Sequence, residues 1–325
     1  STVTSCSGFA TEKRRREAMA SPTQEQETTG SGGDEDSARR PLLALSPRYH
    51  LHAVAGTNAA TAASARVLLT VELPAVTADI IDALPALELV VALSVGVDHI
   101  GLAVCRHRGV RVTNAGDAYS SDAADLRRWS RRRGAPLRRR RRRVPAHGEY
   151  PLAAKRVGIV GLGSIGSLVA RRLAAFGCPV AYHSRTRKPA PCPYTFFPTV
   201  RALAADSDVL VLACALTEET RRVVDREVME ALGAGGVLVN VGRGGLVDEP
   251  ELVRCLREGV IGGAGLDVFE NEPDVPAELL DVDNVVLSSH KAVATAESIR
   301  GVLDAVSGNL EAFFAGRPLL SPVSL

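Results

Sequence analysis

The feature that most constrains the fold is a glycine-rich turn, Gly161-Leu162-Gly163-Ser164-Ile165-Gly166, in the stretch KRVGIVGLGSIGSLVARRL. A strand pattern precedes the turn directly and an amphipathic helix pattern follows it. Here Gly161 permits a tight turn, Gly163 leaves room for a pyrophosphate, and Gly166 lets helix and strand pack closely. The first N–H groups of the helix then face the phosphates. A glycine-rich turn without a ligand is the alternative, but strand, spacing and helix together favour a dinucleotide site.

Strand and helix patterns alternate through most of the chain beyond this turn. The predicted strands are KRVGIVG, PVAYHS, DVLVLAC, VLVNVG, GGAGLDVF and NVVLSSH. The predicted helices are SIGSLVARRLAAFG, VRALAADS, DREVMEALG and DEPELVRCLREG. This alternation predicts a doubly wound α/β domain with a parallel sheet. The last stretch, ATAESIRGVLDAVSGNLEAFFAG, predicts one long amphipathic helix closed by Gly316, long enough to return to the first domain and pack there.

The same alternation occurs earlier, between Pro41 and Thr113, and predicts a further parallel sheet covered on both faces. Its predicted strands are ARVLLTV, LELVVAL and VRVTN. TADIIDAL and VDHIGLAVCRHRG are predicted as helices, the second closed by Gly109. Residues 1–40 are rich in Ser, Thr, Gly and Glu and have no apolar period, so this segment is predicted to be disordered.

An arginine-rich tract interrupts this pattern, with eleven arginines between Arg127 and Arg143. Removing their charges from the formal net charge of +2 leaves −9, so the rest of the chain is acidic. This balance argues against nucleic acid as a partner of the folded body. The six cysteines form no C-x-x-C pair and no cluster with histidines, which predicts free thiols, no metal and the cytosol. No apolar run approaches the roughly 20 residues needed to span a bilayer.

The end of the predicted strand PVAYHS indicates which nicotinamide cofactor is used. An NAD site usually has an acidic residue about 20 residues past the turn, where it holds the ribose hydroxyls. No acidic residue occurs from Tyr150 to Ala205, and the strand ends instead in His183-Ser184-Arg185-Thr186-Arg187-Lys188. A hydroxyl followed by cations suits a 2′-phosphate, which Arg185 can pair bidentately. NADPH is therefore expected, and NADH with a merely solvated basic loop is the alternative.

Polar residues end three later strand patterns: Arg243 in VLVNVGRGG, Asp267 and Glu272 in GLDVFENEP, and His290 in NVVLSSHKA. Taken singly, Arg243 also fits an ordinary surface arginine, and His290 also fits a buried histidine of the core. In this order after a dinucleotide turn, they resemble the D-isomer-specific 2-hydroxyacid dehydrogenases. The stretches SVGVDHI, VRVTNAGDA, HSRTRKP and ALTEET are most similar to the plant hydroxyphenylpyruvate reductases of that family, which also reduce hydroxypyruvate and glyoxylate. The resemblance covers about Pro41 to Leu325, except the tract.

The resemblance implies two Rossmann-like domains with a cleft between them. A flavodoxin-like substrate domain would comprise residues 41–121 and 291–325, and a doubly wound NAD(P)-binding domain residues 122–290. A small-molecule 2-oxo acid is the implied substrate, but the sequence does not rank hydroxyphenylpyruvate, hydroxypyruvate and glyoxylate. A second copy of the chain, in a homodimer, is the implied partner.

The resemblance also implies roles for single residues. His290 would be the general acid that protonates the C2 oxygen during hydride transfer, and Glu272 would hold it in its protonated form. Arg243 would bind the 2-oxo acid with its planar fork. The amides of Val95 and Gly96 would take the carboxylate. Cofactor contacts are implied for Gly161, Gly163, Ser164, Ile165, Gly166, Ser184, Arg185, Thr186, Ala215, Thr217, Val241, Gly242, Arg243 and Asp267.

The sequence departs from the family at three places. Residues 126–145 carry arginines, Gly134 and Pro136 where the family has an apolar-faced helix, and a proline costs a helix interior about 3 kcal/mol. A compensated frameshift would leave such a segment. In PLLALSPRYHLHAV, one strand pattern runs almost directly into the next, where the family has a helix between them. Ser289 stands where the family has a proline. The alternatives to a reductase are an inactive relative that binds polyanions through the tract, and a chain that does not fold.

Overall fold

The chain consists of two compact units in the computed structural model, which describes residues 2–6, 50–53, 59–70, 75–124, 155–288, 290 and 295–325. Unit 1 comprises residues 1–119 and 295–325, and unit 2 comprises residues 120–294. The predicted domain limits were 121 and 291. The arginine-rich segment 126–145 lies outside the described residues, and so does Ser289.

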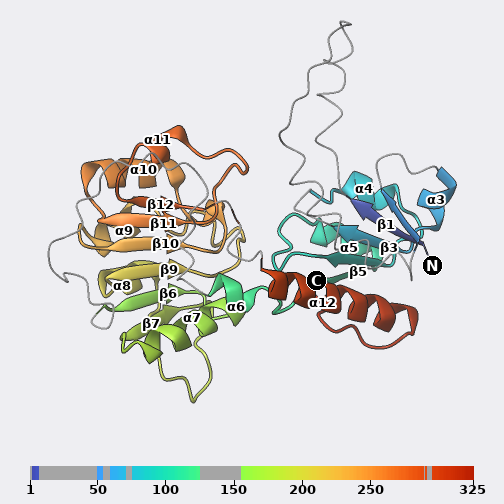
Figure 1. The fold of residues 1–325 in the computed structure, drawn as a ribbon, viewed down its shortest axis with the longest axis horizontal. Coiled ribbons are helices and arrows are strands. Elements are labelled where there is room, and N and C mark those ends of the chain that lie inside the picture. Colours follow the sequence, from blue (N-terminus) through green and yellow to red (C-terminus); the bar gives the residue numbers. More distant parts are fainter. Residues whose placement is uncertain are drawn as a thin grey trace, which may run out of the picture. The chain divides into compact units, whose positions relative to one another are not determined.

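Unit 1 contains a parallel five-stranded sheet in the order β2-β1-β3-β4-β5, which is the flavodoxin-like order (Figure 1). Its strands are β1 (Thr2–Cys6), β2 (His50–Ala53), β3 (Val67–Thr70), β4 (Leu89–Ala92) and β5 (Arg111–Thr113). The three strands predicted from ARVLLTV, LELVVAL and VRVTN are confirmed as β3, β4 and β5. The flavodoxin-like fold expected for this part of the chain is therefore present.

The prediction of disorder for residues 1–40 was wrong for its first residues. Thr2–Cys6 forms β1, which pairs in parallel with both β2 and β3. The physical reason is local, because Thr-Val-Thr has the β-branched side chains that favour an extended strand. The surrounding Ser- and Glu-rich composition concealed this short stretch. Residues 7–40 lie outside the described residues.

Helices cover both faces of the unit 1 sheet. They are α3 (Ala59–Ser64), α4 (Ala78–Asp82), α5 (Leu102–Arg108) and α12 (Ala296–Phe314). Because side chains alternate along a strand, Val67 and Leu69 of β3 pack with α12, whereas Leu68 packs with α4 and α5. The predicted long C-terminal helix therefore does return to the first sheet. Gly109 ends α5 in the left-handed conformation, as predicted.

Unit 2 contains a parallel seven-stranded sheet in the order β12-β11-β10-β9-β6-β7-β8. Its strands are β6 (Val157–Val160), β7 (Val180–His183), β8 (Thr195–Phe196), β9 (Val209–Leu212), β10 (Val237–Asn240), β11 (Gly263–Leu266) and β12 (Val285–Leu287). All six predicted strands are confirmed, and only the two-residue β8 was not predicted. The order reverses beside β6, which is the doubly wound arrangement.

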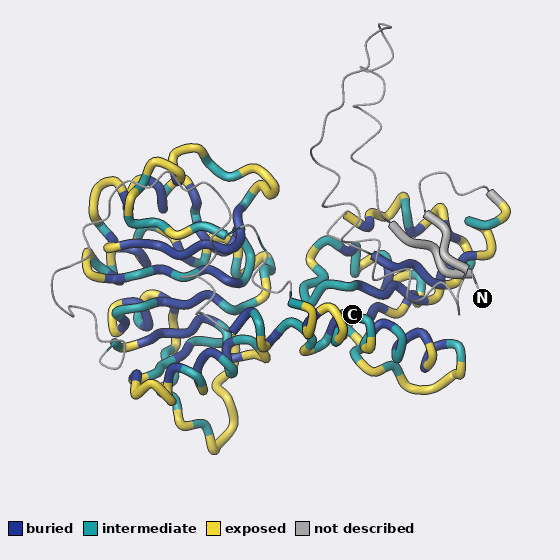
Figure 2. The backbone as a smooth tube through the Cα atoms, in the orientation of Figure 1, coloured by how far each residue is buried: buried dark blue, intermediate teal, exposed yellow. Residues whose placement is uncertain are grey.

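The helices of unit 2 include all four that were predicted, together with two short helices and a 3-10 turn that were not predicted. They are α6 (Ser120–Ala123), α7 (Ser164–Ala175), α8 (Val200–Ala205), α9 (Arg226–Leu232), α10 (Glu249–Glu258) and the short α11 (Ala277–Leu280), with a 3-10 turn at Gly244–Leu246. Alternate side chains of the sheet face α7 on one side and α8, α9 and α10 on the other. The strands are accordingly the most buried part of the unit (Figure 2).

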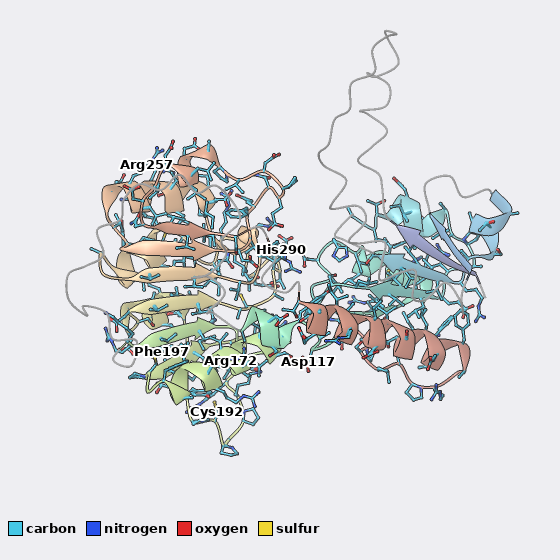
Figure 3. The ribbon with its side chains drawn as sticks, in the orientation of Figure 1. Asp117, Arg172, Cys192, Phe197, Arg257 and His290 are labelled. Atoms are coloured by element: carbon cyan, nitrogen blue, oxygen red, sulfur yellow. The ribbon has the colours of Figure 1, made fainter. Side chains whose placement is uncertain are left out.

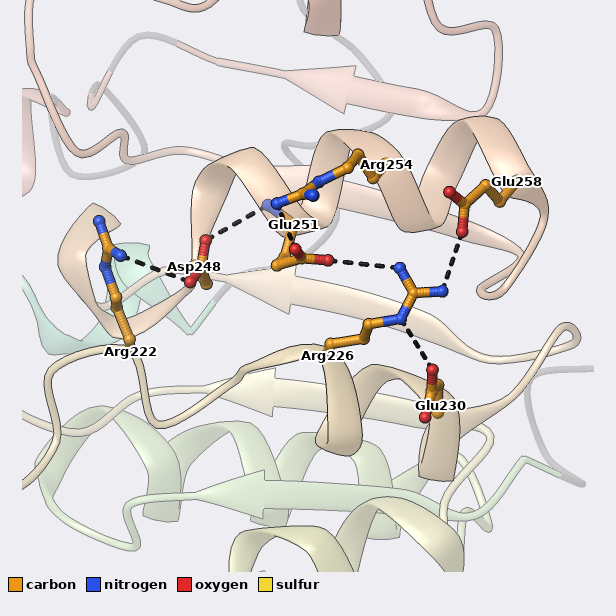
Figure 4. A network of polar contacts seen from close by, with 7 residues as sticks. All are labelled: Arg222, Arg226, Glu230, Asp248, Glu251, Arg254 and Glu258. Carbon is orange, nitrogen blue, oxygen red and sulfur yellow. Dashed lines mark hydrogen bonds and ion pairs between the residues drawn. The ribbon is translucent and has the colours of Figure 1, made fainter.

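A network of ion pairs joins α9 to α10 on the surface of unit 2 (Figure 4). The Arg226 guanidinium lies 2.8 Å from Glu230, 3.4 Å from Glu251 and 3.0 Å from Glu258. Exposed pairs of this kind contribute little to stability because water screens them, so the apolar layer beneath them holds the helices. In the described part of the chain, no helix is long and apolar enough to cross a membrane.

Candidate active site

All but two of the predicted site residues lie in unit 2, in loops that follow strands or in the first turn of α7. The glycine-rich turn follows β6, Ser184 follows β7, and Thr217 follows β9. The Arg243 loop follows β10, and Asp267 follows β11. His290, which is labelled in Figure 3, follows β12. Because the strands are parallel, the loops after their carboxyl ends share one edge of the sheet. This edge therefore brings the residues together although they span more than a hundred positions of sequence.

The glycine-rich turn has the geometry that each of its glycines predicts. Gly161 has a φ of 99°, and a Cβ on it would lie 2.7 Å from the backbone of Cys214. A Cβ on Gly166 would collide with the Gly161 carbonyl. By contrast, among the described residues no atom beyond the immediate chain neighbours lies within 4 Å of the place where a Cβ on Gly163 would stand. The turn is therefore tightly packed at two glycines and open at the third, immediately before α7.

The chain after β7 forms an exposed basic turn. The Ser184 hydroxyl donates a hydrogen bond to the Thr186 carbonyl at 2.6 Å, and the Lys188 amide donates to the Tyr182 hydroxyl at 2.9 Å. Arg185 and Thr186 are exposed. These hydrogen bonds fix the course of the backbone while the Arg185 guanidinium stays accessible. The loop thus has the shape and charge of an anion-binding turn.

The loop after β9 is held by a threonine that the sequence did not single out. The Thr220 hydroxyl accepts a hydrogen bond from the Thr217 amide at 2.7 Å and donates to the Ala215 carbonyl at 2.8 Å. The Thr217 hydroxyl donates to Glu219 at 2.7 Å. Next to this loop, burial raises the pKa of the Cys214 thiol to about 11, so the thiol is protonated at neutral pH.

Asn240, the last residue of β10, orders the loop that carries Arg243. Its side chain donates to the Arg243 carbonyl at 2.9 Å and accepts from the Gly242 amide at 3.1 Å. The Arg243 guanidinium donates to the Gly242 carbonyl at 2.9 Å. A Cβ on Gly244 would collide with the backbone of Phe269, so the Arg243 loop packs directly on the loop after β11. The sequence carried a signal for Asn240, a polar residue at the end of a buried apolar strand.

His290 and Glu272 form a hydrogen-bonded pair. The His290 Nδ1 lies 2.7 Å from a Glu272 carboxylate oxygen, and the other oxygen of that carboxylate accepts from the Phe269 amide at 2.9 Å. The backbone amide of His290 donates to the Asp267 carbonyl at 2.8 Å. Because Nδ1 faces the carboxylate, Nε2 is the ring nitrogen left to act on a ligand.

Asp267 holds the loop that carries His290 through hydrogen bonds. Its side chain is buried and accepts a hydrogen bond from the Ser288 hydroxyl, two residues before His290. His290 itself has a φ of 50°, in the left-handed region that few non-glycine residues adopt. The hydrogen bonds that Asp267 accepts from the His290 amide and the Ser288 hydroxyl, together with the His290–Glu272 contact, hold the histidine in this conformation. Ser288 was not among the predicted residues.

The pKa of the Glu272 carboxyl is held below its usual value. Burial alone would raise it, but the hydrogen bond from His290, the Phe269 amide and the charges of His290 and Arg243 together outweigh burial. The carboxylate is therefore ionised at neutral pH, with about 30% of its side chain exposed. The ionised carboxylate is the hydrogen-bond partner of His290 Nδ1.

This lowered pKa predicts how stability depends on pH. Glu272 is harder to protonate in the folded chain, so its contribution is fully present above the unfolded pKa of about 4.5 and is lost as pH falls through the folded value. We expect Glu272→Gln to lower the urea midpoint at pH 7, with a deficit that shrinks toward pH 3. Glu278→Gln, at an exposed position on α11, is the control. A deficit that stays constant from pH 7 to pH 3 would contradict the assignment.

Val95 and Gly96 lie in unit 1, in the loop after β4. The Val95 carbonyl accepts a hydrogen bond from the Asn114 side chain at 2.8 Å, and the Gly96 carbonyl accepts one from the Ser94 hydroxyl at 2.7 Å. No described residue accepts a hydrogen bond from the amide of Val95 or Gly96. The loop therefore has its carbonyls occupied while these two N–H groups are available.

Known proteins are similar to this chain in sequence and fold. The family model for "D-isomer specific 2-hydroxyacid dehydrogenase, NAD binding domain" matches residues 122–292. A glyoxylate/hydroxypyruvate reductase of Arabidopsis thaliana is 50% identical over 280 residues, which cover 81% of this chain and 84% of that protein. Hydroxyphenylpyruvate reductase of Plectranthus scutellarioides is 50% identical over 257 residues, covering 76% and 81%.

A solved structure agrees over nearly the whole chain. It is the NADPH-dependent glyoxylate/hydroxypyruvate reductase of Sinorhizobium meliloti in complex with NADP and malonate, with a TM-score of 0.78, 31% identity and coverage of 99% of this chain and 97% of that one. A doubly wound domain with this glycine-rich turn and an arginine, a glutamate and a histidine at one edge defines a dinucleotide-dependent oxidoreductase. The chain belongs to the D-isomer-specific 2-hydroxyacid dehydrogenase family.

The residues present fit the dinucleotide that this family binds. The open position at Gly163, directly before α7, is where a pyrophosphate can approach the backbone and the first N–H groups of the helix. A side chain at that position would fill the space. The exposed Arg185 at the end of β7 fits an anionic group on the ribose. The sequence-based prediction of a dinucleotide fold at this turn is confirmed.

Proposed function

We propose that the protein reduces small 2-oxo acids to 2-hydroxy acids with NADPH. The observation that carries the proposal is the His290–Glu272 pair at 2.7 Å, at the same sheet edge as the glycine-rich turn. An acid held by a carboxylate at the same sheet edge as a dinucleotide turn suits proton transfer coupled to hydride transfer. The named relatives support the substrate class, because they are reductases of glyoxylate, hydroxypyruvate and hydroxyphenylpyruvate.

NADPH is the proposed cofactor, with NADH as the weaker alternative. Gly161, Gly163 and Gly166 shape the turn, and Ser164 and Ile165 begin the helix whose N–H groups would face the pyrophosphate. The residues proposed to hold the rest of the cofactor are Ser184, Arg185, Thr186, Ala215, Thr217, Val241, Gly242, Arg243 and Asp267. The relative of known structure from Sinorhizobium meliloti is NADPH-dependent, which supports the choice.

The side chains of this chain supply the proton and orient the acid. When bound, NADPH supplies the hydride that adds to C2 of the 2-oxo acid. His290 gives its Nε2 proton to the C2 oxygen, so the carbonyl becomes a hydroxyl. Glu272 stabilises the imidazolium before the transfer and keeps Nε2 directed at the substrate. The Arg243 guanidinium orients the planar 2-oxo acid, and the Val95 and Gly96 amides bind its carboxylate.

Substrate and surroundings complete the proposal. The substrate class comprises hydroxyphenylpyruvate, hydroxypyruvate and glyoxylate, and the compartment is the cytosol. We infer a homodimer from the family resemblance. The helix that commonly mediates it would lie at residues 126–145, whose arginines make the dimer the least supported part of the proposal. Sedimentation of the purified chain tests this part directly.

The proposal is tested by the oxidation of NADPH, followed by absorbance, with each of the three 2-oxo acids. We expect turnover with at least one of them, and a lower kcat/KM with NADH. Turnover with a 2-oxo acid requires one intact site, so this result would also exclude an inactive polyanion-binding relative. No turnover with any of the three acids, in a chain that melts cooperatively and binds NADPH, would contradict the proposed reaction.

A further inference from the structure

We infer that Asn114 is a positioning residue for the loop of Val95 and Gly96, and that the C-terminal residues of the chain hold Asn114 in place. Asn114 directly follows β5, and it belongs to unit 1 together with the loop. The inference rests on the proposed function, because it concerns how this loop presents two amides to the carboxylate of a 2-oxo acid.

Three hydrogen bonds fix the backbone of the loop. The Asn114 Nδ2 donates to the Val95 carbonyl at 2.8 Å, and the Ala115 amide donates to the Ser94 carbonyl at 2.9 Å. The Ser94 hydroxyl donates to the Gly96 carbonyl at 2.7 Å. Two consecutive carbonyls of the loop are thus held by two consecutive residues after β5. Asn114 also keeps its own turn, because its Oδ1 accepts from the Gly116 amide at 3.0 Å.

Planar trans peptide units turn these carbonyl contacts into amide directions. The Val95 carbonyl and the Gly96 N–H belong to one peptide unit and point in opposite directions. Holding the carbonyl toward Asn114 therefore directs the Gly96 N–H away from Asn114. The Ser94 carbonyl and the Val95 N–H are related in the same way, through Ala115. Residues 114 and 115 consequently set the direction of both amides assigned to the carboxylate.

The C-terminal segment holds Asn114 through a second set of hydrogen bonds. The Ser321 hydroxyl donates to the Asn114 carbonyl at 2.6 Å, and the Asn114 amide donates to the Ser321 carbonyl at 3.3 Å. Asn309 of α12, which is fully buried, donates to the Ser321 hydroxyl at 2.9 Å and accepts from the Leu320 amide at 2.9 Å. The Val323 amide donates to the Val112 carbonyl of β5 at 2.9 Å.

This arrangement would bind the carboxylate, which is the group that all 2-oxo acids share. Two fixed amides that donate to no described residue suit the two oxygens of one carboxylate, and a fixed array costs no reorganisation when the anion binds. The two amides would contact only the carboxylate, and not the group attached to C2 that differs from one 2-oxo acid to another. Loss of the array is therefore expected to weaken every 2-oxo acid substrate by the same factor and to leave cofactor binding unchanged.

The test compares Asn114→Asp and Asn114→Ala with the unaltered full-length chain. Aspartate keeps the size of the side chain and the acceptor for Gly116, but it cannot donate to the Val95 carbonyl. Alanine removes the donor without adding a charge near the substrate carboxylate. We expect KM for glyoxylate and for hydroxypyruvate to rise by the same factor, about tenfold or more, with kcat within twofold. The Kd for NADPH, from fluorescence, is expected to stay unchanged.

Amide exchange gives a readout that does not depend on turnover. The Ala115 amide donates to Ser94 and lies in a buried residue, so loosening of the loop is expected to speed its hydrogen exchange in both variants. Asn284→Asp is the matched control, because Asn284 Nδ2 donates to the Gly262 carbonyl at 2.9 Å in unit 2. This control is expected to keep the KM and the Ala115 exchange rate of the unaltered chain.

Distinct results overturn the inference and the proposed function. Unchanged KM in both Asn114 variants, or a fall in kcat alone, overturns the positioning role. Unequal KM changes for the two acids would also overturn it, since the loop would then contact a part of the substrate other than the carboxylate. Failure of the unaltered chain to reduce any 2-oxo acid refutes the proposed reaction, whereas the exchange of Ala115 still decides whether Asn114 orders the loop.

Discussion

Replacing His290 with asparagine is expected to lower kcat for 2-oxo acid reduction by about 10²- to 10⁴-fold, the usual contribution of a positioned general acid. Asparagine suits the position because it tolerates the left-handed backbone that His290 adopts, with a φ of 50°. It can still donate a hydrogen bond, but it cannot give up a proton. The measurement is steady-state NADPH oxidation at saturating substrate.

Two accompanying measurements show whether that loss is chemical. The Kd for NADPH is expected to remain that of the unaltered chain, because His290 lies in the loop after β12 and not in the glycine-rich turn. The same substitution at the exposed His107 of α5 is expected to leave kcat unchanged. If kcat for His290→Asn stays within tenfold of that of the unaltered chain, His290 is not the general acid.

Replacing Arg185 with alanine is expected to raise the Kd for NADPH by about 10- to 150-fold, which corresponds to the roughly 1.5–3 kcal/mol of a hydrogen bond between charged groups. The Kd for NADH is expected to change little, because NADH lacks the 2′-phosphate. The selectivity between the two cofactors would therefore collapse. Titration of each cofactor by fluorescence measures both constants without turnover.

The control for this change is Arg201→Ala on α8. The Arg201 side chain is 68% exposed and lies 3.6 Å from Glu227, so this variant removes one surface guanidinium without touching the turn after β7. It is expected to leave both cofactor affinities unchanged. Equal losses of NADPH and NADH affinity in Arg185→Ala would show that Arg185 binds a part common to both cofactors.

The sequence predicts the framework of this protein because the framework depends on local patterns. Apolar runs of four to eight residues predicted nine strands, since a strand buried on both faces has no polar positions. The spacing of three glycines predicted the turn, whose tight packing at Gly161 and Gly166 leaves no room for side chains. The left-handed end of α5 was predicted from Gly109 alone.

Individual hydrogen bonds, which depend on the folded course of a loop or on a partner strand, could not be predicted from such patterns. Asn240 reads as one polar position in a strand, and only the folded loop shows that it bonds to both Gly242 and Arg243. Thr220 and Ser288 act through hydroxyls whose partners depend on the course of a loop. Thr2–Cys6 is a strand because two partners from elsewhere in the chain complete its hydrogen bonds.

The division of the chain has a consequence for its synthesis. Unit 1 begins the sequence and also ends it, with all of unit 2 between its two segments. A ribosome that adds about 5–20 residues per second needs roughly 10–35 s to pass through unit 2. During that time the face of β3 and β4 that α12 covers, with Val67, Leu69 and Val91, has no helix to bury it. Synthesis of α12 thus ends a period in which this face is open to aggregation or chaperone capture.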